Sequence, residues 1–144
     1  MKKMPRLTSG GSYTDQRGTI KFFNELDLAP VRRFYILEFS DPSKVRAWNG
    51  HKVEQKWLFV IEGSLKIVLV KPDDWQHPSA DLPCEEMELQ AGANQVLHIP
   101  GGFAFGFQSL AQHSRLMMFS DFTIEQSKND DFRFDQQLWY DWSK

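Results

Sequence analysis

The chain has 144 residues, 41% of them hydrophobic and 25% charged, and this composition predicts one domain with one core over residues 1–144. The formal net charge of −2 is not typical of proteins that bind nucleic acid or an anionic membrane, so any bound anion must be held by a few placed Arg and Lys side chains. The basic residues 1–6 lead into a polar segment and not into an apolar run, which predicts neither a signal peptide nor a membrane anchor and favours a cytoplasmic location.

Short runs rich in β-branched and aromatic residues recur between turn signals along the chain, and no segment shows a convincing 3.6-residue period. Many short strands at this spacing predict an all-β, antiparallel sandwich or barrel. The expected strands are "RRFYILEF" (32–39), "KWLFVI" (56–61), "LKIVLV" (65–70), "NQVLHI" (94–99), "FAFGF" (103–107) and "RLMMFS" (115–120).

The stretch "VRAWNGHKVEQKW", residues 45–57, is expected to be extended and is unusually polar for a strand. Strict alternation of side chains would put His51 on the face opposite to Arg46 and Lys56. A bulge at Gly50 would shift this register and bring the two cations to the side of His51. The faces of this strand are therefore open at the level of sequence.

His51 is the candidate base on this strand, because an imidazole among Arg, Lys and Asn neighbours carries a proton that titrates near neutral pH. A structural His is the alternative. Lys52 and Glu54 are expected to be solvated side chains on the polar face of a half-buried strand.

The stretch 56–71, "KWLFVIEGSLKIVLVK", is expected to form a β-hairpin, with Gly63 supplying the positive φ that a tight turn needs. Residues 71–83 are too polar and Pro-rich for a central strand and predict a surface excursion. The tail from residue 122 is rich in aromatic side chains, so it is expected to pack across the barrel or against a partner subunit.

In "GANQVLHIPGGFAFGF", residues 92–107, a strand ends at Pro100 and a Gly-Gly turn starts another strand. Together with the "GHK" around residue 50, this segment resembles the two motifs of a cupin, an antiparallel double-stranded β-helix or jelly-roll barrel. Metal-binding cupins carry further His ligands where this chain has Asn49 and Phe105. Because His51 alone is left, we expect no metal and no other cofactor.

Within the cupins, the sequence is similar to the group that contains dTDP-4-dehydrorhamnose 3,5-epimerase and the dTDP-sugar 3,4-ketoisomerases. The similarity rests on "DQRGTIKFFN" (15–24), "VRAWNGHK" with "QKW" in 45–57, "EGSLKIVLVK" (62–71) and "LHIPGGFAFGF" (97–107). It implies a dTDP-4-keto-6-deoxyhexose type of substrate, a role in cell-surface polysaccharide biosynthesis and a homodimer that exchanges N-terminal strands. The implied roles are diphosphate binding for Arg17 and Arg46, further substrate binding for Asn49 and Gln55, proton abstraction for His51 and enolate stabilisation for Lys56.

The chain departs from this family at three positions. The epimerase base falls at Asn49, a second His at Phe105 and the epimerase's Tyr acid near Thr123, and none of these residues exchanges a proton at neutral pH. A 3,4-ketoisomerase transfers protons between C3 and C4 on one face of the sugar only. The resemblance therefore implies this activity, with His51 as base. A cupin that binds a nucleotide sugar without turnover is the alternative, and a binder of a sugar without a nucleotide is a third interpretation.

Overall fold

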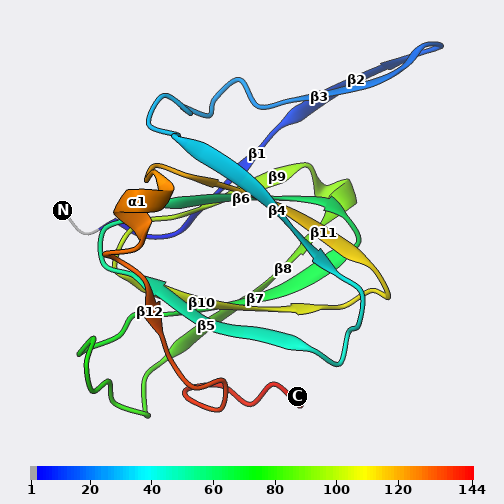
Figure 1. Cartoon of the computed structure of the whole chain (residues 1–144). Helices are drawn as coiled ribbons and strands as arrows, with labels where there is room; N and C mark the ends of the chain where they lie inside the picture. The colour runs from blue at the N-terminus through cyan, green and yellow to red at the C-terminus, as the bar shows by residue number, and fades with distance from the viewer. Residues whose placement is uncertain (1–2) are drawn as a thin grey trace.

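The computed structural model describes residues 3–144 and shows two facing antiparallel sheets of five strands each, with a separate hairpin that projects from one end (Figure 1). Sheet I contains, in spatial order, β1 (Arg6–Ser9), β9 (Gln95–Ile99), β6 (Lys56–Glu62), β11 (Ser114–Ser120) and β4 (Arg33–Phe39). Sheet II contains β12 (Phe132–Arg133), β5 (Val45–His51), β10 (Phe103–Ser109), β7 (Ser64–Val70) and β8 (Cys84–Gln90). The hairpin pairs β2 (Gly11–Asp15) with β3 (Gly18–Phe22), and the helical segments are η1 (Ala91–Ala93) and α1 (Ile124–Ser127).

The expected all-β antiparallel architecture and its main strands are confirmed. Alternating apolar residues of both sheets point inward and form the main core, as the period of two along each strand requires. A second buried cluster joins sheet II to the C-terminal tail and contains Trp48, Val68, Val70, Tyr140 and Trp142. The most deeply buried aliphatic members are Leu58, Leu65, Ile67, Leu97 and Leu116.

Gly63 has φ of +80°, which confirms the positive φ expected there, but the expected hairpin is wrong. The strand before Gly63 belongs to sheet I and the strand after it to sheet II, so the two do not pair. The turn carries the chain across the core from one sheet to the other. β7 buries six of its seven residues and β6 four of its seven, and runs of this kind lack the clear alternation that would mark a partner strand.

The single extended segment expected over residues 45–57 is also wrong, because β5 ends at His51 and a turn through 52–55 leads into β6. The irregularity lies nearer the start of β5 than Gly50. There Phe105 pairs with Asn49 and Phe107 with Arg46, so two residues of β5 lie opposite one residue of β10. This bulge turns Arg46 toward the side of Asn49.

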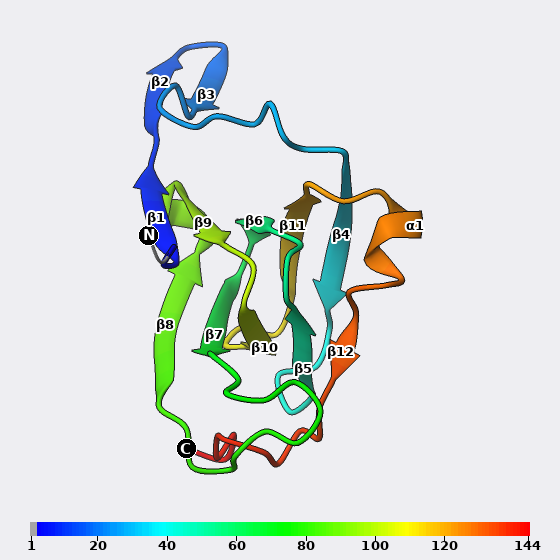
Figure 2. The same ribbon diagram turned by 90° about the vertical axis from the view of Figure 1, so that its left-hand side faces the viewer.

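The tail after β11 packs across its own barrel (Figure 2). This is one of the two arrangements that the sequence predicted for it. The Trp48 indole nitrogen donates a hydrogen bond of 2.7 Å to the carbonyl of Leu138, and its ring contacts those of Trp139 and Trp142. Residues 71–83 form no strand, which confirms the expected excursion. Within residues 3–144, no helix has the length and apolar character needed to cross a membrane.

Candidate functional site

A cavity of about 780 Å³ is lined by residues of both sheets and of the segment that carries α1 and β12. Its residues come from β4, β5, β6, β10, β11 and this C-terminal segment. Lys and Arg side chains outnumber carboxylates on its wall, where Asp131 is the one acidic side chain of the described residues. The cationic lining residues are Arg33, Arg46, Lys56, Lys128 and Arg133.

His51 lies in the cavity wall at the end of β5 and is only 3% exposed. Its Nδ1 is 2.6 Å from the main-chain oxygen of Asp130, which fixes the tautomer with the proton on Nδ1. Its Nε2 is buried and has no hydrogen-bond partner among the residues that the structure describes. Burial lowers the pKa of His51, so the imidazole is neutral at neutral pH and Nε2 carries a free lone pair.

Lys56 is buried at the start of β6, with its ammonium group 2.8 Å from Glu54 Oε2 and 2.8 Å from the Tyr35 hydroxyl oxygen. Because the ammonium group donates to the oxygen of Tyr35, the hydroxyl proton of Tyr35 stays available for another acceptor. Tyr35 lies on β4 and also lines the cavity. Tyr35 was not predicted from sequence, because its place within an ordinary amphipathic strand gives no sign of a functional role.

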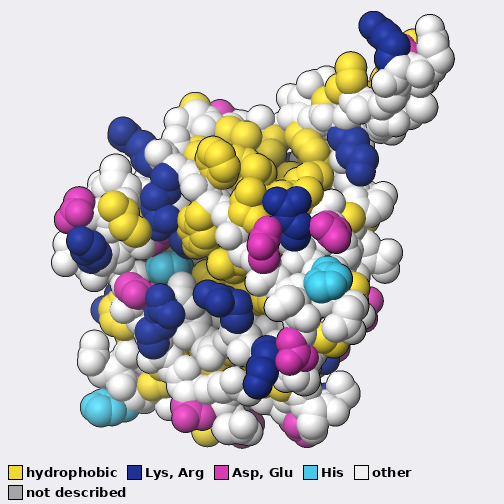
Figure 3. Space-filling model, turned by 45° about the vertical axis from the view of Figure 1, so that its right-hand side comes forward, with side chains coloured by type: hydrophobic (Ala, Val, Ile, Leu, Met, Phe, Trp, Pro, Cys, Tyr) yellow, Lys and Arg dark blue, Asp and Glu magenta, His cyan; other side chains and the backbone are white. Residues whose placement is uncertain are grey.

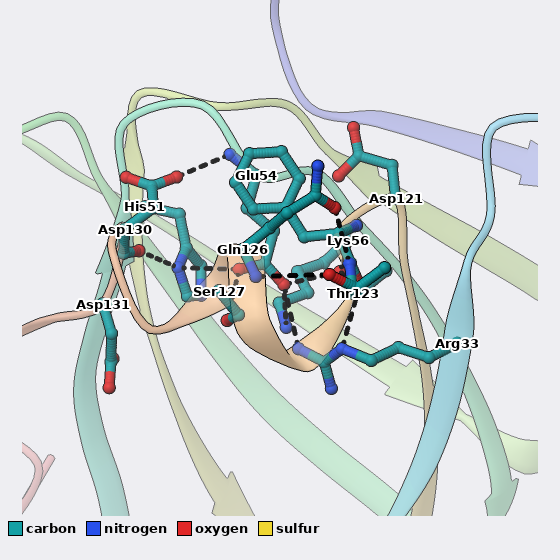
Figure 4. Close-up of polar contacts among 12 residues, drawn as sticks. Arg33, His51, Glu54, Lys56, Asp121, Thr123, Gln126, Ser127, Asp130 and Asp131 are labelled. Carbon is teal, nitrogen blue, oxygen red and sulfur yellow. Dashed lines mark hydrogen bonds and ion pairs between the residues drawn. The ribbon is translucent and has the colours of Figure 1, made fainter.

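Glu54 lies in the turn between β5 and β6 and is 1% exposed, so the expectation of a solvated side chain is wrong. Burial would raise its pKa, but hydrogen bonds from Lys56, Ser120 and Ser127 outweigh burial and lower it. Arg33 adds an ion pair at 3.2 Å (Figure 4). The turn between β5 and β6 folds the Glu54 carboxylate inward. In the sequence, the only sign of this burial was that Glu54 stands two residues before Lys56.

The mouth of the cavity is polar. Asn49 donates from Nδ2 to Asp131 Oδ1 at 2.7 Å, and Arg133 donates to the same oxygen at 2.8 Å. Arg46 and Lys128 also line the cavity and are exposed. Charge-assisted donors of this kind suit phosphate oxygens.

The floor of the cavity is apolar. The ring of Phe105 lies 5.7 Å from the His51 ring, at the position where, by the resemblance, the family has a second His. Phe107, Leu37 and Met118 complete this surface. A ligand that fills the cavity therefore combines an anionic end with a less polar end.

The structure brings together Arg46, Asn49, His51 and Lys56 in one cavity, whereas Arg17 and Gln55 lie elsewhere. Arg17 lies at the tip of the β2–β3 hairpin, where its exposed guanidinium is 2.6 Å from Asp15.

Gln55 contacts two residues outside the cavity lining. Its Oε1 is 2.7 Å from His98 Nε2, and its amide nitrogen donates to Asp121 at 3.0 Å. Thr123, near which the family's Tyr acid falls, caps α1 by accepting from the Gln126 amide.

No group of three His, Cys, Asp or Glu side chains that could hold a metal occurs in residues 3–144. The three cupin ligand positions are filled by Asn49, His51 and Phe105, and Asn49 pairs with Phe105 across β5 and β10. Of these three residues, His51 alone carries a nitrogen of the kind that binds transition metals. The absence of a bound metal stays a prediction.

No protein-family model and no curated protein sequence matches the chain. Solved structures do match its fold. A dTDP sugar isomerase from Desulfovibrio desulfuricans G20 superposes with a TM-score of 0.77 at 17% identity, over 96% of this chain and 90% of that one. The dTDP-4-dehydrorhamnose 3,5-epimerase from Elizabethkingia anophelis NUHP1 gives 0.71 at 21% identity, over 97% and 81% of the two chains.

A 3,4-ketoisomerase from Thermoanaerobacterium thermosaccharolyticum, solved in complex with TDP, gives a TM-score of 0.72 at 19% identity, over 93% of this chain and 90% of that one. At these identities the likeness shows the fold. The chain has the cupin fold of the dTDP-sugar epimerases and isomerases, as its sequence motifs predict.

Proposed function

We propose that the protein is a sugar 3,4-ketoisomerase that acts on a nucleotide-linked 4-keto-6-deoxyhexose, with His51 as its base. The observation that carries the proposal is the buried, unpartnered Nε2 of His51 in the cavity wall, with Nδ1 fixed by the carbonyl of Asp130. A neutral imidazole that is held by one nitrogen and free at the other is the arrangement a general base needs. The ligands named for the solved neighbours, TDP and dTDP-4-keto-L-rhamnose, support the substrate class.

The chemistry starts at the carbon next to the ketone. His51 Nε2 takes the proton from C3, the electrons of the C–H bond form a C3–C4 double bond, and negative charge collects on the C4 oxygen. His51 then returns its proton to C4, the C3 hydroxyl gives its proton to the C4 oxygen, and C3 becomes the ketone while C4 carries the hydroxyl. Atoms and electrons balance without a cofactor.

Lys56 and Tyr35 are placed to stabilise the enolate. The buried ammonium group of Lys56 supplies positive charge in the cavity, and the hydroxyl proton of Tyr35 is available to the enolate oxygen. Such groups act strongly where water is scarce, because their charge is poorly screened. Tyr35 also supplies a proton donor that sequence analysis did not find.

The same cavity argues against 3,5-epimerisation. An epimerase must protonate the sugar from the face opposite to its base. The residues at the family's acid position are Thr123, which caps a helix, and Ile124, which lines the cavity. Neither residue exchanges a proton at neutral pH.

The cationic mouth is the proposed site of the diphosphate. Arg46, Lys128 and Arg133 lie there, and Asn49 can donate through its amide group. The formal charge of the whole chain is −2, so this local excess of cations is a feature of the cavity and not of the surface in general.

We also propose a homodimer in which the β2–β3 hairpin of one subunit brings Arg17 to the cavity of the other. The hairpin stands clear of its own barrel (Figures 1 and 2), with Tyr13 58% and Ile20 62% exposed. On β4, Phe34 is 59% exposed, and hydrophobic side chains gather on the face shown in Figure 3. Apolar surface of this kind favours a partner.

A nucleotide-sugar-binding protein without turnover is the second candidate. The observation that favours it is Phe105, which presents an apolar ring to His51 where the related enzymes carry a second His. Such a protein would keep the cationic mouth and bind dTDP, but it would not exchange protons of the sugar.

Deuterium exchange decides between the two candidates. The protein is incubated with dTDP-4-keto-6-deoxyglucose in heavy water and followed by NMR. The ketoisomerase is expected to place deuterium at C3 of the 4-keto substrate and at C4 of the 3-keto product, and not at C5. His51→Asn is expected to abolish the exchange while dTDP still binds. No exchange in the wild type, with dTDP bound, would favour the non-catalytic candidate. Exchange that persists in His51→Asn would show that another residue is the base.

A further inference from the structure

We propose that Glu54 is a positioning residue for the isomerisation, with one carboxylate oxygen facing His51 and the other holding Lys56. A single buried side chain would then set the base and the enolate-stabilising cation against the same substrate. The inference rests on the proposed function, but its decisive measurement is made on the protein without substrate.

The two oxygens of Glu54 have different partners (Figure 4). Oε1 lies 3.4 Å from His51 Nδ1 and accepts a hydrogen bond of 2.7 Å from the Ser127 hydroxyl. Oε2 lies 2.8 Å from the Lys56 ammonium group and 3.2 Å from an Arg33 guanidinium nitrogen. The carboxylate therefore lies between the base and two cations, in a place where its own side chain has no exposure.

Proton abstraction gives a reason for a carboxylate beside the base. When His51 takes a proton it becomes a cation in a buried site, and an isolated buried charge is costly. Two negative groups offset this cost, Glu54 and the Asp130 carboxylate, and the main-chain oxygen of Asp130 accepts the Nδ1 proton. Lys56 acts in the opposite sense, and Asp131 at the mouth interacts with His51 more weakly.

Lys56 gives a second reason. Its ammonium group is held between Glu54 and the Tyr35 hydroxyl, so its position depends on this carboxylate. Without Glu54, Lys56 and Arg33 would be two cations with no shared counter-charge on this side of the cavity. Repulsion between them would move the ammonium group from the place where the enolate oxygen forms.

A purely structural role is the competing explanation, because Glu54 also ties the β5–β6 turn to β4, β11 and α1 through Arg33, Ser120 and Ser127. The two roles differ in one measurable property. A structural tie affects the stability of the fold, whereas a carboxylate that faces the base also sets the pKa of His51. The test therefore reads that pKa directly.

The experiment titrates the His51 side chain by NMR in the full-length wild type, in Glu54→Gln and in the control Glu38→Gln. Glu38 is an exposed carboxylate on β4 that pairs with Arg115. We expect Glu54→Gln to lower the pKa of His51 by about one unit and kcat by about 10²-fold, since a nearby opposite charge favours the charged imidazole. Glu38→Gln is expected to change neither.

Glu54→Gln leaves the Arg33 cation without its carboxylate partner, so this variant could fail to fold. A double variant is therefore measured as well. Glu54→Gln combined with Arg33→Gln removes that cation, and the pKa of His51 is expected to fall there as well. An unchanged pKa of His51 together with unchanged kcat, even with lower stability, overturns the inference and leaves a structural tie. A wild type without turnover overturns the proposed function, whereas turnover that Glu54→Gln leaves intact overturns this inference alone.

Discussion

The ammonium nitrogen of Lys56 and the hydroxyl oxygen of Tyr35 lie 2.8 Å apart in the wall of the cavity, with the cation also 4.9 Å from the centre of the Tyr35 ring. The contact joins β6 to β4, and both residues line the cavity together with His51. The hydroxyl of Tyr35 accepts from Lys56, so its proton can pass to the oxygen of a bound sugar.

Removal of that hydroxyl tests its role. We expect Tyr35→Phe to lower kcat of the isomerisation by about 10²-fold with little change in KM, because the lost donor acts on charge that forms only in the transition state. Product formation followed by NMR measures the effect. Tyr140→Phe is the matched control, since its hydroxyl bonds Glu86 outside the cavity lining. Equal losses in both variants would contradict the assignment.

Lys56→Met tests the cation itself. Because Lys56 is only 2% exposed and its charge is therefore poorly screened, we expect C3 deuterium exchange to slow by about 10²-fold or more. The same variant leaves Glu54 with one cation fewer, so circular dichroism must first show that it folds. Lys52→Met, at an exposed position one residue after His51, is the control and should exchange at the wild-type rate.

The activity should persist to lower pH than an ordinary His would allow. Burial lowers the pKa of His51 below its usual value of 6.5, and the base must be neutral to act. A profile of kcat/KM against pH is therefore expected to fall only below about 6.5, with its acidic midpoint at the lowered pKa. A midpoint above 6.5 would show that His51 is charged more readily than in water.

The same shift predicts how stability depends on pH. The folded protein binds a proton at His51 less readily than the unfolded chain, so this residue stabilises the fold above the unfolded pKa and loses that contribution as pH falls. His98 is shifted in the same direction by burial and adds to the effect. Thermal unfolding of the wild type and of His51→Asn at several pH values separates the two, and His51→Asn should show the weaker loss in acid.

The shared site is tested through Arg17. If the β2–β3 hairpin supplies Arg17 to a partner's cavity, sedimentation shows a dimer and Arg17→Ala weakens dTDP binding by about tenfold, as the loss of one charge-assisted contact predicts. Lys21→Ala, on the same hairpin, is the control. A monomer, or unchanged affinity in Arg17→Ala, would contradict the shared site.

Metal content has a direct test. Elemental analysis of the purified protein is expected to find no stoichiometric transition metal, and treatment with a chelator is expected to leave its unfolding temperature unchanged. About one zinc, iron or nickel per chain would overturn this prediction. It would also require ligands beyond the single nitrogen that His51 offers at the cupin positions.

Local patterns in the sequence were sufficient for the strands and for part of the site. Runs of β-branched and aromatic residues predicted β4, β6, β7, β9, β10 and β11, because alternation and turn chemistry act between near neighbours. The motif around residue 50 located His51 and Lys56, and both line the cavity. These features depend on residue types and short spacings alone.

Other features depend on which distant segments meet. Sequence could not tell that the strands on either side of Gly63 join different sheets, because their long apolar runs carry no alternation that marks a partner strand. It could not place Glu54, since a carboxylate is buried only where cations and hydroxyls from other elements surround it.

His51 shows the same difference between what the sequence determines and what the tertiary structure decides. The sequence by itself determined that His51 stands on a polar strand of an antiparallel β-barrel, with Arg46, Asn49 and Lys56 nearby along the chain. Only the tertiary structure decided that these side chains share one cavity, because a bulge in β5 opposite β10 turns Arg46 toward the side of Asn49. The tertiary structure also places the main-chain oxygen of Asp130 against His51 Nδ1 and leaves His51 Nε2 without a partner among the described residues. No local pattern encodes such a hydrogen bond, because only folding brings these two distant segments together.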